Sequence, residues 1–161
     1  MDQCITDIDI KFIRQTIDIA KLSVEHGNQP FGALLADKNG NVLILSENME
    51  ITSKDKTCHA EKNLVSEIYL RGYTKQELSG MTMYTSTEPC VMCTGALVKS
   101  GIGRIVYGCS AETMSKIANG GSFNIPCSYL ASYSKHPVVV VGPVIEDEAK
   151  LIHIDYWPNR V

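Results

Sequence analysis

The spacing of apolar residues along the chain predicts helices and strands that alternate. Residues 10–24 carry apolar side chains at helical spacing, with Thr6 or Asp7 placed to cap this helix and Gly27 placed to end it. Short apolar runs, separated by turn residues and by further helical patterns, continue to the end of the chain. They predict strands at 31–36, 42–45, 81–86, 104–107 and 138–141 and helices at 58–71, 90–99 and 145–156.

The order of these elements predicts an α/β fold. The Asp-Lys-Asn-Gly sequence at 37–40 is a hairpin signal, so the first two strands should be antiparallel. The later strands are joined by helices and should be parallel, which predicts a three-layer α-β-α sandwich around a five-stranded mixed sheet. The apolar runs at 42–45 and 138–141 are typical of strands buried on both faces. Residues 109–137 fit least well and predict a long loop around one short helix, and such loops are often functional.

Composition and charge limit the classes of function. The 161 residues predict a single domain over 1–161. A net charge of −3 weighs against nucleic acid as the main partner. No apolar stretch approaches the roughly 20 residues of a membrane helix and no signal peptide is visible, so we expect no membrane association and a cytoplasmic location. Six cysteines are too few for a disulfide scaffold and are interpreted as metal ligands, catalytic groups or small buried side chains.

Two short segments carry the candidate chemistry. Residues 58–61 (Cys-His-Ala-Glu) enter one predicted helix, and residues 88–93 (Glu-Pro-Cys-Val-Met-Cys) enter another. Cys90 and Cys93 are three residues apart and would share one helix face, and His59 can supply a third ligand from the neighbouring helix. Three protein ligands leave one coordination position open, which is the arrangement of a catalytic zinc ion.

The position of Glu61 relative to His59 adds a catalytic group. Residues two apart lie about 200° apart around a helix, so His59 and Glu61 converge on one ion only at the helix end. A carboxylate there that is not a metal ligand can accept the proton of an attacking water and pass it to a leaving group. His-x-Glu together with Pro-Cys-x-x-Cys is the signature of zinc deaminases, in which water replaces an amine on a ring carbon.

With these segments the chain resembles the cytidine deaminase superfamily over nearly its whole length. Residues 30–33 (Pro-Phe-Gly-Ala), Asn48 and the two zinc segments occur in the order of that family. The chain is most similar to the compact branch of guanine deaminases, fungal-type cytosine deaminases and tRNA adenosine deaminases. This resemblance implies the cytidine-deaminase-like form of the sandwich.

The resemblance also assigns roles to individual residues. It implies one zinc ion per subunit, held by His59, Cys90 and Cys93, and Glu61 as the catalytic proton shuttle. It further implies contacts with the substrate from the residues Asn48, Phe31 and Ala60. The same branch forms homodimers with active sites near the subunit interface, so a homodimer is expected.

The function that the resemblance implies is hydrolytic deamination of a free nucleobase or nucleoside, with release of ammonia. Residues 30–33 and the Glu-Pro-Cys sequence at 88–90 resemble guanine or nucleoside deaminases, whereas Cys-Thr-Gly-Ala at 93–96 resembles fungal cytosine deaminase. A guanine-like purine is the first expectation and cytosine the second. Nothing acidic follows Trp157, where the fungal cytosine enzyme carries a pocket aspartate.

Other interpretations of the same residues are open. Editing of adenosine to inosine in tRNA would need a basic groove, which the net charge does not favour. A non-catalytic zinc-binding protein on the same fold would have no need of Glu61. A Cys-x-x-Cys pair alone is also compatible with a structural zinc knuckle or a redox pair. Asn48 alone reads as a turn residue with local backbone bonds, and Phe31 as core.

Overall fold

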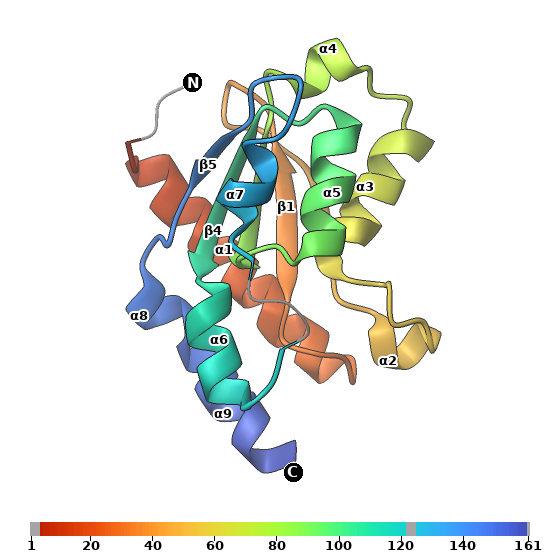
Figure 1. Cartoon of the computed structure of the whole chain (residues 1–161). Coiled ribbons are helices and arrows are strands. Elements are labelled where there is room, and N and C mark those ends of the chain that lie inside the picture. The colour runs from red at the N-terminus through yellow and green to blue at the C-terminus, as the bar shows by residue number, and fades with distance from the viewer. Residues whose placement is uncertain (1–3, 122–124, 161) are drawn as a thin grey trace.

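The computed structural model describes residues 4–121 and 125–160, which form a mixed sheet with helices on both faces (Figure 1). The sheet has five strands in the order β2-β1-β3-β4-β5. The strands are β1 (Gly32–Ala36), β2 (Val42–Glu47), β3 (Thr82–Thr87), β4 (Arg104–Cys109) and β5 (Val139–Val141).

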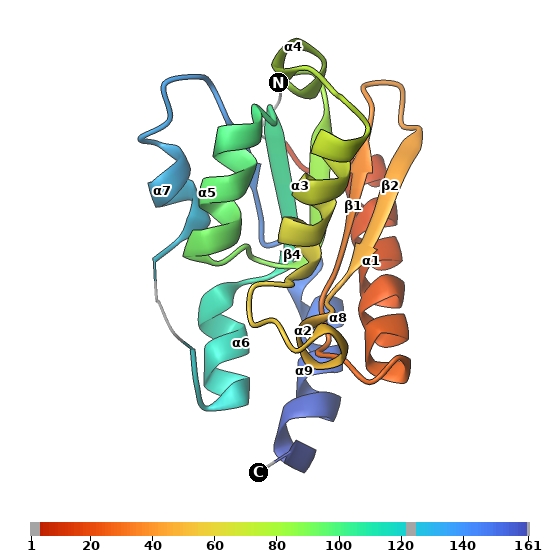
Figure 2. The same cartoon turned by 90° about the vertical axis from the view of Figure 1, so that its right-hand side faces the viewer.

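The helices make the outer two of three layers (Figure 2). Helix α1 (Asp7–Glu25) packs on one face of the sheet, and α3 (Ala60–Leu70) and α5 (Val91–Ser100) pack on the other. The remaining helical segments are α2 (Glu50–Ser53), α4 (Lys75–Leu78), α6 (Ala111–Ala118), α7 (Cys127–Ala131), α8 (Glu146–Ala149), α9 (Leu151–Tyr156) and the 3-10 helix η1 (Trp157–Arg160). Among the described residues, no helix combines the length and the apolar composition that crossing a bilayer requires.

The pairing of the strands confirms the predicted mixed sheet. β1 is antiparallel to both β2 and β3, whereas β3, β4 and β5 are mutually parallel. The hairpin at 37–40 joins β1 to β2 as predicted, and the helical connections accompany the parallel strands. The three-layer α/β prediction is therefore confirmed, while a single domain over 1–161 stays a prediction.

The two continuous apolar runs are not buried on both faces, so that prediction was wrong. The strand order places β2 and β5, which contain these runs, at the two edges of the sheet. Leu45 of β2 is 56% exposed, and two of the three residues of β5 are only partly buried. The central strands β1 and β4 are instead buried along their whole length, although β4 contains an arginine and a tyrosine. An apolar run alone does not tell an edge strand from a central one, because both bury at least one face.

Close packing of α1 on β1 depends on a glycine. The predicted N-cap Thr6 is confirmed and forms a capping box with Asp9. Where the helix passes β1, a Cβ on Gly32 would overlap the carbonyl oxygen of Thr16 and lie 2.7 Å from the amide nitrogen of Ala20. Gly32 therefore lets the helix backbone approach the strand directly, at the end of β1 that lies beside the C-terminal end of β3.

Three further segments differ from their predictions. Residues 50–57 lie between a predicted strand and a predicted helix, where the polar sequence indicates a loop, but they contain α2. The segment 109–137 contains two helices, α6 and α7, rather than one, and residues 122–124 within it lie outside the described part. Helix α7 is stabilised by burial of Cys127 and Ala131, two small side chains one turn apart that give only a weak apolar pattern. The predicted closing helix is divided into α8 and α9, after a left-handed residue at Ile145.

Candidate active site

The two chemistry-bearing segments meet at one end of the sheet. The chain leaves β3 at Thr87 and begins α5 at Val91, and α3 begins nearby at Ala60 (Figure 2). His59 is the N-cap of α3 and Cys90 is the N-cap of α5, so both residues lie just outside their helices in extended backbone. The expectation that Cys90 and Cys93 share a helix face is therefore wrong in detail, since only Cys93 lies within the helix. The two helix N-termini nevertheless bring all three side chains together.

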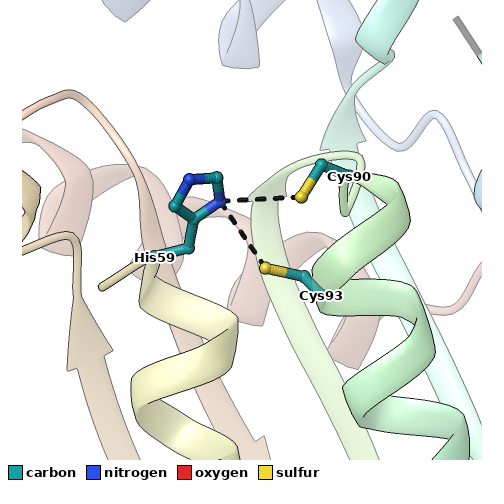
Figure 3. Close-up of side chains that lie close together, drawn as sticks. All are labelled: His59, Cys90 and Cys93. Atoms are coloured by element: carbon teal, nitrogen blue, oxygen red, sulfur yellow. Dashed lines mark hydrogen bonds between the residues drawn. The ribbon is translucent and has the colours of Figure 1, made fainter. Parts of the chain in front are cut away.

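The ligand atoms have the separations that a tetrahedral zinc ion requires. The Nδ1 atom of His59 lies 3.6 Å from Sγ of Cys90 and 3.6 Å from Sγ of Cys93 (Figure 3). All three ligand atoms lie within 4.8 Å of one another. Zinc bonds of about 2.3 Å to sulfur and about 2.05 Å to nitrogen, at a tetrahedral angle, place nitrogen and sulfur about 3.5 Å apart. The two nitrogen–sulfur separations therefore fit a tetrahedral Zn²⁺, and three protein ligands leave a fourth position open.

Electrostatics within the cluster favour a cation. Hydrogen bonds from Cys93 and His59 outweigh the cost of burial and lower the pKa of Cys90 to about 4. The bond to Cys90 in turn raises the pKa of His59 to about 9, against the effect of burial. The hydrogen bond between Cys93 and Cys90, together with burial, raises the pKa of Cys93. A thiolate at a helix N-terminus is stabilised by the helix dipole, and a divalent ion would replace the protons that the three groups share.

Glu61 lies in the first turn of α3, where its side chain is removed from water. It is 5% exposed and is not one of the three groups of the metal cluster. The hydroxyl of Thr85, on β3, donates a long hydrogen bond of 3.4 Å to Oε1 of Glu61. Burial raises the pKa of this carboxyl, and the nearby positive charge of His59 only partly opposes the increase. A carboxyl with a raised pKa is suited to accept and release a proton near neutral pH.

Asn48 follows β2 and is completely buried. Its Oδ1 accepts a hydrogen bond of 3.0 Å from the backbone amide of Glu50, and its Nδ2 donates at 3.3 Å to Oε2 of Glu50. Oε2 of Glu50 lies 3.7 Å from Nε2 of His59. The structure thus shows the local backbone bond that a turn asparagine makes, and it also places Asn48 one side chain away from the metal cluster.

Phe31 forms an aromatic group with the C-terminal helices. Its ring centroid lies 5.4 Å from that of His153 and 6.3 Å from that of Trp157. The carbonyl oxygen of Phe31 accepts a hydrogen bond of 3.0 Å from the amide of Asn48, so this aromatic group adjoins the asparagine. Phe31 is partly exposed, as a residue that lines a pocket would be.

His153 is the central member of this aromatic group. Its Nδ1 accepts a hydrogen bond of 3.1 Å from the indole N–H of Trp157, which can only donate. Nε2 therefore carries the ring proton and donates it at 2.7 Å to the hydroxyl of Thr87. Burial lowers the pKa of His153 to about 4, so the ring is neutral at physiological pH. These contacts make His153 a hydrogen-bonded, structural member of the aromatic group.

Ala60 is a predicted site residue whose side chain lies in the apolar core. It is fully buried with the apolar side chains between the sheet and α3, and its carbonyl oxygen accepts a hydrogen bond of 2.7 Å from the hydroxyl of Ser46. It lies between His59 and Glu61 in the chain, so its backbone is held at the metal cluster. Its side chain, in contrast, belongs to the core.

Sequence reasoning missed two polar residues of this region. Glu50 was expected to be a loop residue, and only the folded turn brings its carboxylate to His59. Thr85 lies in a strand with several Ser and Thr residues, and nothing in the sequence marks it as the partner of Glu61.

Comparison with known proteins places the chain in a family. The sequence matches the model of the cytidine and deoxycytidylate deaminase zinc-binding region over residues 6–109, which is more than half of the chain. A probable cytosine deaminase from Schizosaccharomyces pombe is 37% identical over 158 residues, which cover 95% of this chain and 94% of that protein. A tRNA-specific adenosine deaminase from Haemophilus influenzae is 35% identical over 147 residues, covering 89% of this chain and 79% of that protein.

Solved structures agree with the fold. A guanine deaminase from Nitrosomonas europaea has a TM-score of 0.75 and 17% identity, with 98% of this chain and 96% of that chain covered. Solved structures of similar fold hold 8-azaguanine or 2,6-diaminopurine. The matched family region contains His59, Glu61 and both cysteines of the metal cluster. The chain therefore belongs to the cytidine and deoxycytidylate deaminase family of zinc-dependent hydrolytic enzymes.

Proposed function

We propose that this protein catalyses the zinc-dependent hydrolytic deamination of a free nucleobase or nucleoside. The observation that carries the proposal is the geometry at the two helix N-termini: three ligand atoms lie within 4.8 Å of one another, with both nitrogen–sulfur separations tetrahedral and the buried carboxyl of Glu61 on the same helix turn as His59. His59, Cys90 and Cys93 would hold the ion. A purely structural zinc site would have no use for a carboxyl group with a raised pKa.

Glu61 carries the proton transfers in this mechanism. Zinc held by His59, Cys90 and Cys93 would lower the pKa of the attacking water. Glu61 accepts a proton from this water, whose oxygen forms a bond to the ring carbon that carries the exocyclic amine. Glu61 delivers this proton to the adjacent ring nitrogen and then carries the proton of the new hydroxyl group to the amine, so that the carbon–nitrogen bond breaks, ammonia leaves and the ring carbon becomes a carbonyl. Thr85 holds Oε1 of Glu61 by its hydroxyl, and burial keeps the carboxyl out of bulk water.

The substrate would lie between the metal cluster and the aromatic group of Phe31, His153 and Trp157. Asn48 would donate a hydrogen bond to the base from Nδ2, Phe31 would pack on its ring, and the backbone at Ala60 would border it. The sequence motifs favour a guanine-like purine, and similar folds hold 8-azaguanine. The 37% identity to a probable cytosine deaminase extends over nearly the whole chain, whereas the guanine deaminase likeness rests on the fold. We therefore propose cytosine and guanine as the first bases to test, with cytosine first.

Editing of adenosine in tRNA is the second candidate function, because a tRNA-specific adenosine deaminase is 35% identical over most of the chain. Affinity for tRNA would rest on phosphate contacts and fall steeply with salt. The net charge of −3 supports the small substrate instead. The expected homodimer and cytoplasmic location stay predictions.

Release of ammonia by the zinc-loaded protein tests the proposal. The panel contains cytosine, guanine, adenine, their nucleosides and a tRNA with an adenosine at the wobble position, and the Glu61→Ala variant is the blank. We expect release on one free base or nucleoside and none in the blank. Release from tRNA alone would select the editing function. No ammonia release from any member of the panel, with zinc bound, would favour a non-catalytic zinc-binding protein.

A further inference from the structure

The carboxylate of Glu50 is buried at the edge of the metal cluster. Glu50 is the first residue of α2, and its side chain is 9% exposed, which is unusual for a charged residue on a short surface helix. Its Oε2 atom has two neighbours, Nδ2 of Asn48 at 3.3 Å and Nε2 of His59 at 3.7 Å. One carboxylate oxygen thus lies between the predicted substrate-binding amide and a metal ligand.

The orientation of the His59 ring explains why Glu50 matters to the metal. Nδ1 faces the two sulfur atoms at 3.6 Å, so Nε2 points away from the cluster (Figure 3). Oε2 of Glu50 lies 3.7 Å from Nε2. A histidine that ligates through Nδ1 carries its proton on Nε2. Metal-ligating histidines commonly give this second N–H to a carboxylate, which fixes the ring and makes it a better ligand. The distance of 3.7 Å between Nε2 of His59 and Oε2 of Glu50 is too long for a hydrogen bond, so the attraction between the two groups is electrostatic. The Glu50 carboxylate faces the Nε2 edge of the ring.

The orientation of the Asn48 amide is fixed by the same residue. The backbone N–H of Glu50 can only donate, so it selects Oδ1, and the carboxylate can only accept, so it selects Nδ2. A flipped amide would place donor against donor and acceptor against acceptor. The second N–H of Nδ2 makes no hydrogen bond within the described residues, and it is the group that Asn48 can offer to a substrate. Asn48 therefore presents a donor, which selects a carbonyl oxygen or an unprotonated ring nitrogen.

We propose that Glu50 is a positioning residue that sets the metal ligand His59 and the base-binding amide of Asn48 through one carboxylate oxygen. The part of this inference that concerns Asn48 rests on the proposed function. The part that concerns His59 rests on the metal cluster alone. Loss of the carboxylate frees the His59 ring and removes the acceptor that orients Asn48.

Zinc affinity tests the first part. Glu50→Ala and Glu50→Gln are compared with the parent by competition against a chromogenic chelator, and Co²⁺ spectra report the coordination geometry. We expect zinc binding about 10- to 100-fold weaker in Glu50→Ala, a smaller loss in Glu50→Gln, and an altered Co²⁺ spectrum. The control is Glu47→Gln, which removes the same charge three residues earlier from a carboxylate that pairs with His26 at 2.8 Å. Zinc affinity equal to that of the parent in both Glu50 variants would overturn the proposal, even if the parent is active.

A double-mutant cycle with Asn48→Ala tests the second part. On the base that the panel identifies, Glu50→Gln should raise KM, and this effect should disappear in the Asn48→Ala background because Glu50 acts through the amide. Equal KM effects in both backgrounds would overturn the link to Asn48. Thermal unfolding of the metal-free proteins checks that the variants are folded. A parent without activity on any panel member, but with zinc affinity lowered by Glu50→Ala, would refute the proposed function and leave the role toward His59 intact.

Discussion

At the scale of single residues, proton transfer by Glu61 can be separated experimentally from zinc binding by His59, Cys90 and Cys93. Glu61 is buried beside the metal cluster but is not one of its ligands, so Glu61→Gln should retain zinc and lose proton transfer. General acid–base groups contribute about 10²- to 10⁴-fold to a rate, and kcat should fall by at least about 100-fold. Metal analysis and steady-state kinetics measure both effects.

A matched control for this variant lies on the same helix. Glu67 is exposed and pairs with Arg71, so Glu67→Gln makes the same chemical change away from the site and should retain full activity. Retained activity in Glu61→Gln would show that another group carries the proton. Loss of zinc in that variant would show that Glu61 is a ligand after all.

The sequence predicts residues whose role depends on local geometry better than those whose role depends on tertiary contacts. Convergence of His59 and Glu61 at a helix end is predicted from 3.6 residues per turn, and the structure places His59 at the N-cap and Glu61 in the first turn of α3. The partnership of Glu50 with His59 joins residues on two separate turns, and no spacing rule encodes it. The same holds for His153 and Thr87, which are 66 residues apart in the chain.

At the scale of elements, the contact between α1 and β1 can be tested by adding one methyl group. Gly32→Ala would drive a Cβ into the backbone of α1 near Thr16 and Ala20, and neither helix nor central strand can shift without disturbing the core. Overpacking of this kind costs about 1–3 kcal/mol or more, so the free energy of unfolding should fall by at least that amount. Chemical denaturation of the zinc-loaded protein provides the measurement.

Gly95→Ala is the matched control for Gly32→Ala. Gly95 lies in the interior of α5, and a Cβ there would meet nothing within 4 Å. Gly95→Ala should therefore raise stability by about 0.5–1 kcal/mol, since alanine favours the helix over the unfolded chain. Equal effects of the two substitutions would contradict the argument that close approach, rather than backbone freedom, requires Gly32.

The element boundaries also show where apolar pattern fails as a guide. The runs in β2 and β5 have the composition of central strands, yet the strand order puts both at the edges of the sheet. Strand order depends on which connections cross the sheet, and the apolar pattern does not contain that information. The hairpin, the parallel crossovers and the capped first helix were predictable because turn and cap residues determine them locally.

At the scale of the whole molecule, stability should decrease in acid because of a histidine at the end of the sheet that holds the metal cluster. His153 is fully buried and neutral, with a pKa lowered by burial to about 4 from the ordinary 6.5. Between these two values the unfolded chain binds a proton that the folded chain does not, so stability falls as pH decreases through this range. The difference between the two pKa values corresponds to about 3 kcal/mol of unfolding free energy.

In His153→Gln the slope of the unfolding free energy against pH should become smaller between pH 6.5 and pH 4. Denaturation at several pH values would show this. The same substitution at exposed His26 is the control, and an unchanged slope in His153→Gln would refute the argument.

A carboxylate at the opposite end of the sheet should cause a second loss of stability, at a lower pH. Asp9, fully buried at the start of α1, accepts hydrogen bonds of 2.6 and 2.9 Å from Arg104 of β4 and one of 2.9 Å from Tyr84 of β3. Burial alone would raise the pKa of Asp9, but the bonds from Arg104, Thr6 and Tyr84 outweigh it and lower the pKa to about 2. Because the folded pKa lies below the ordinary 3.8, this carboxylate stabilises the fold above about pH 4, and about 2 kcal/mol is lost as the pH falls toward 2.

Asp9→Asn should remove this dependence on pH between 4 and 2. It should also cost about 3–5 kcal/mol at neutral pH, because the guanidinium of Arg104 would be left buried without its partner. Asp18→Asn, at an exposed i,i+3 pair with Lys21, should cost less than about 1 kcal/mol. Equal free energies of unfolding for Asp9→Asn and Asp18→Asn at neutral pH would contradict the argument that the buried Asp9–Arg104 pair stabilises the packing of α1 on the sheet.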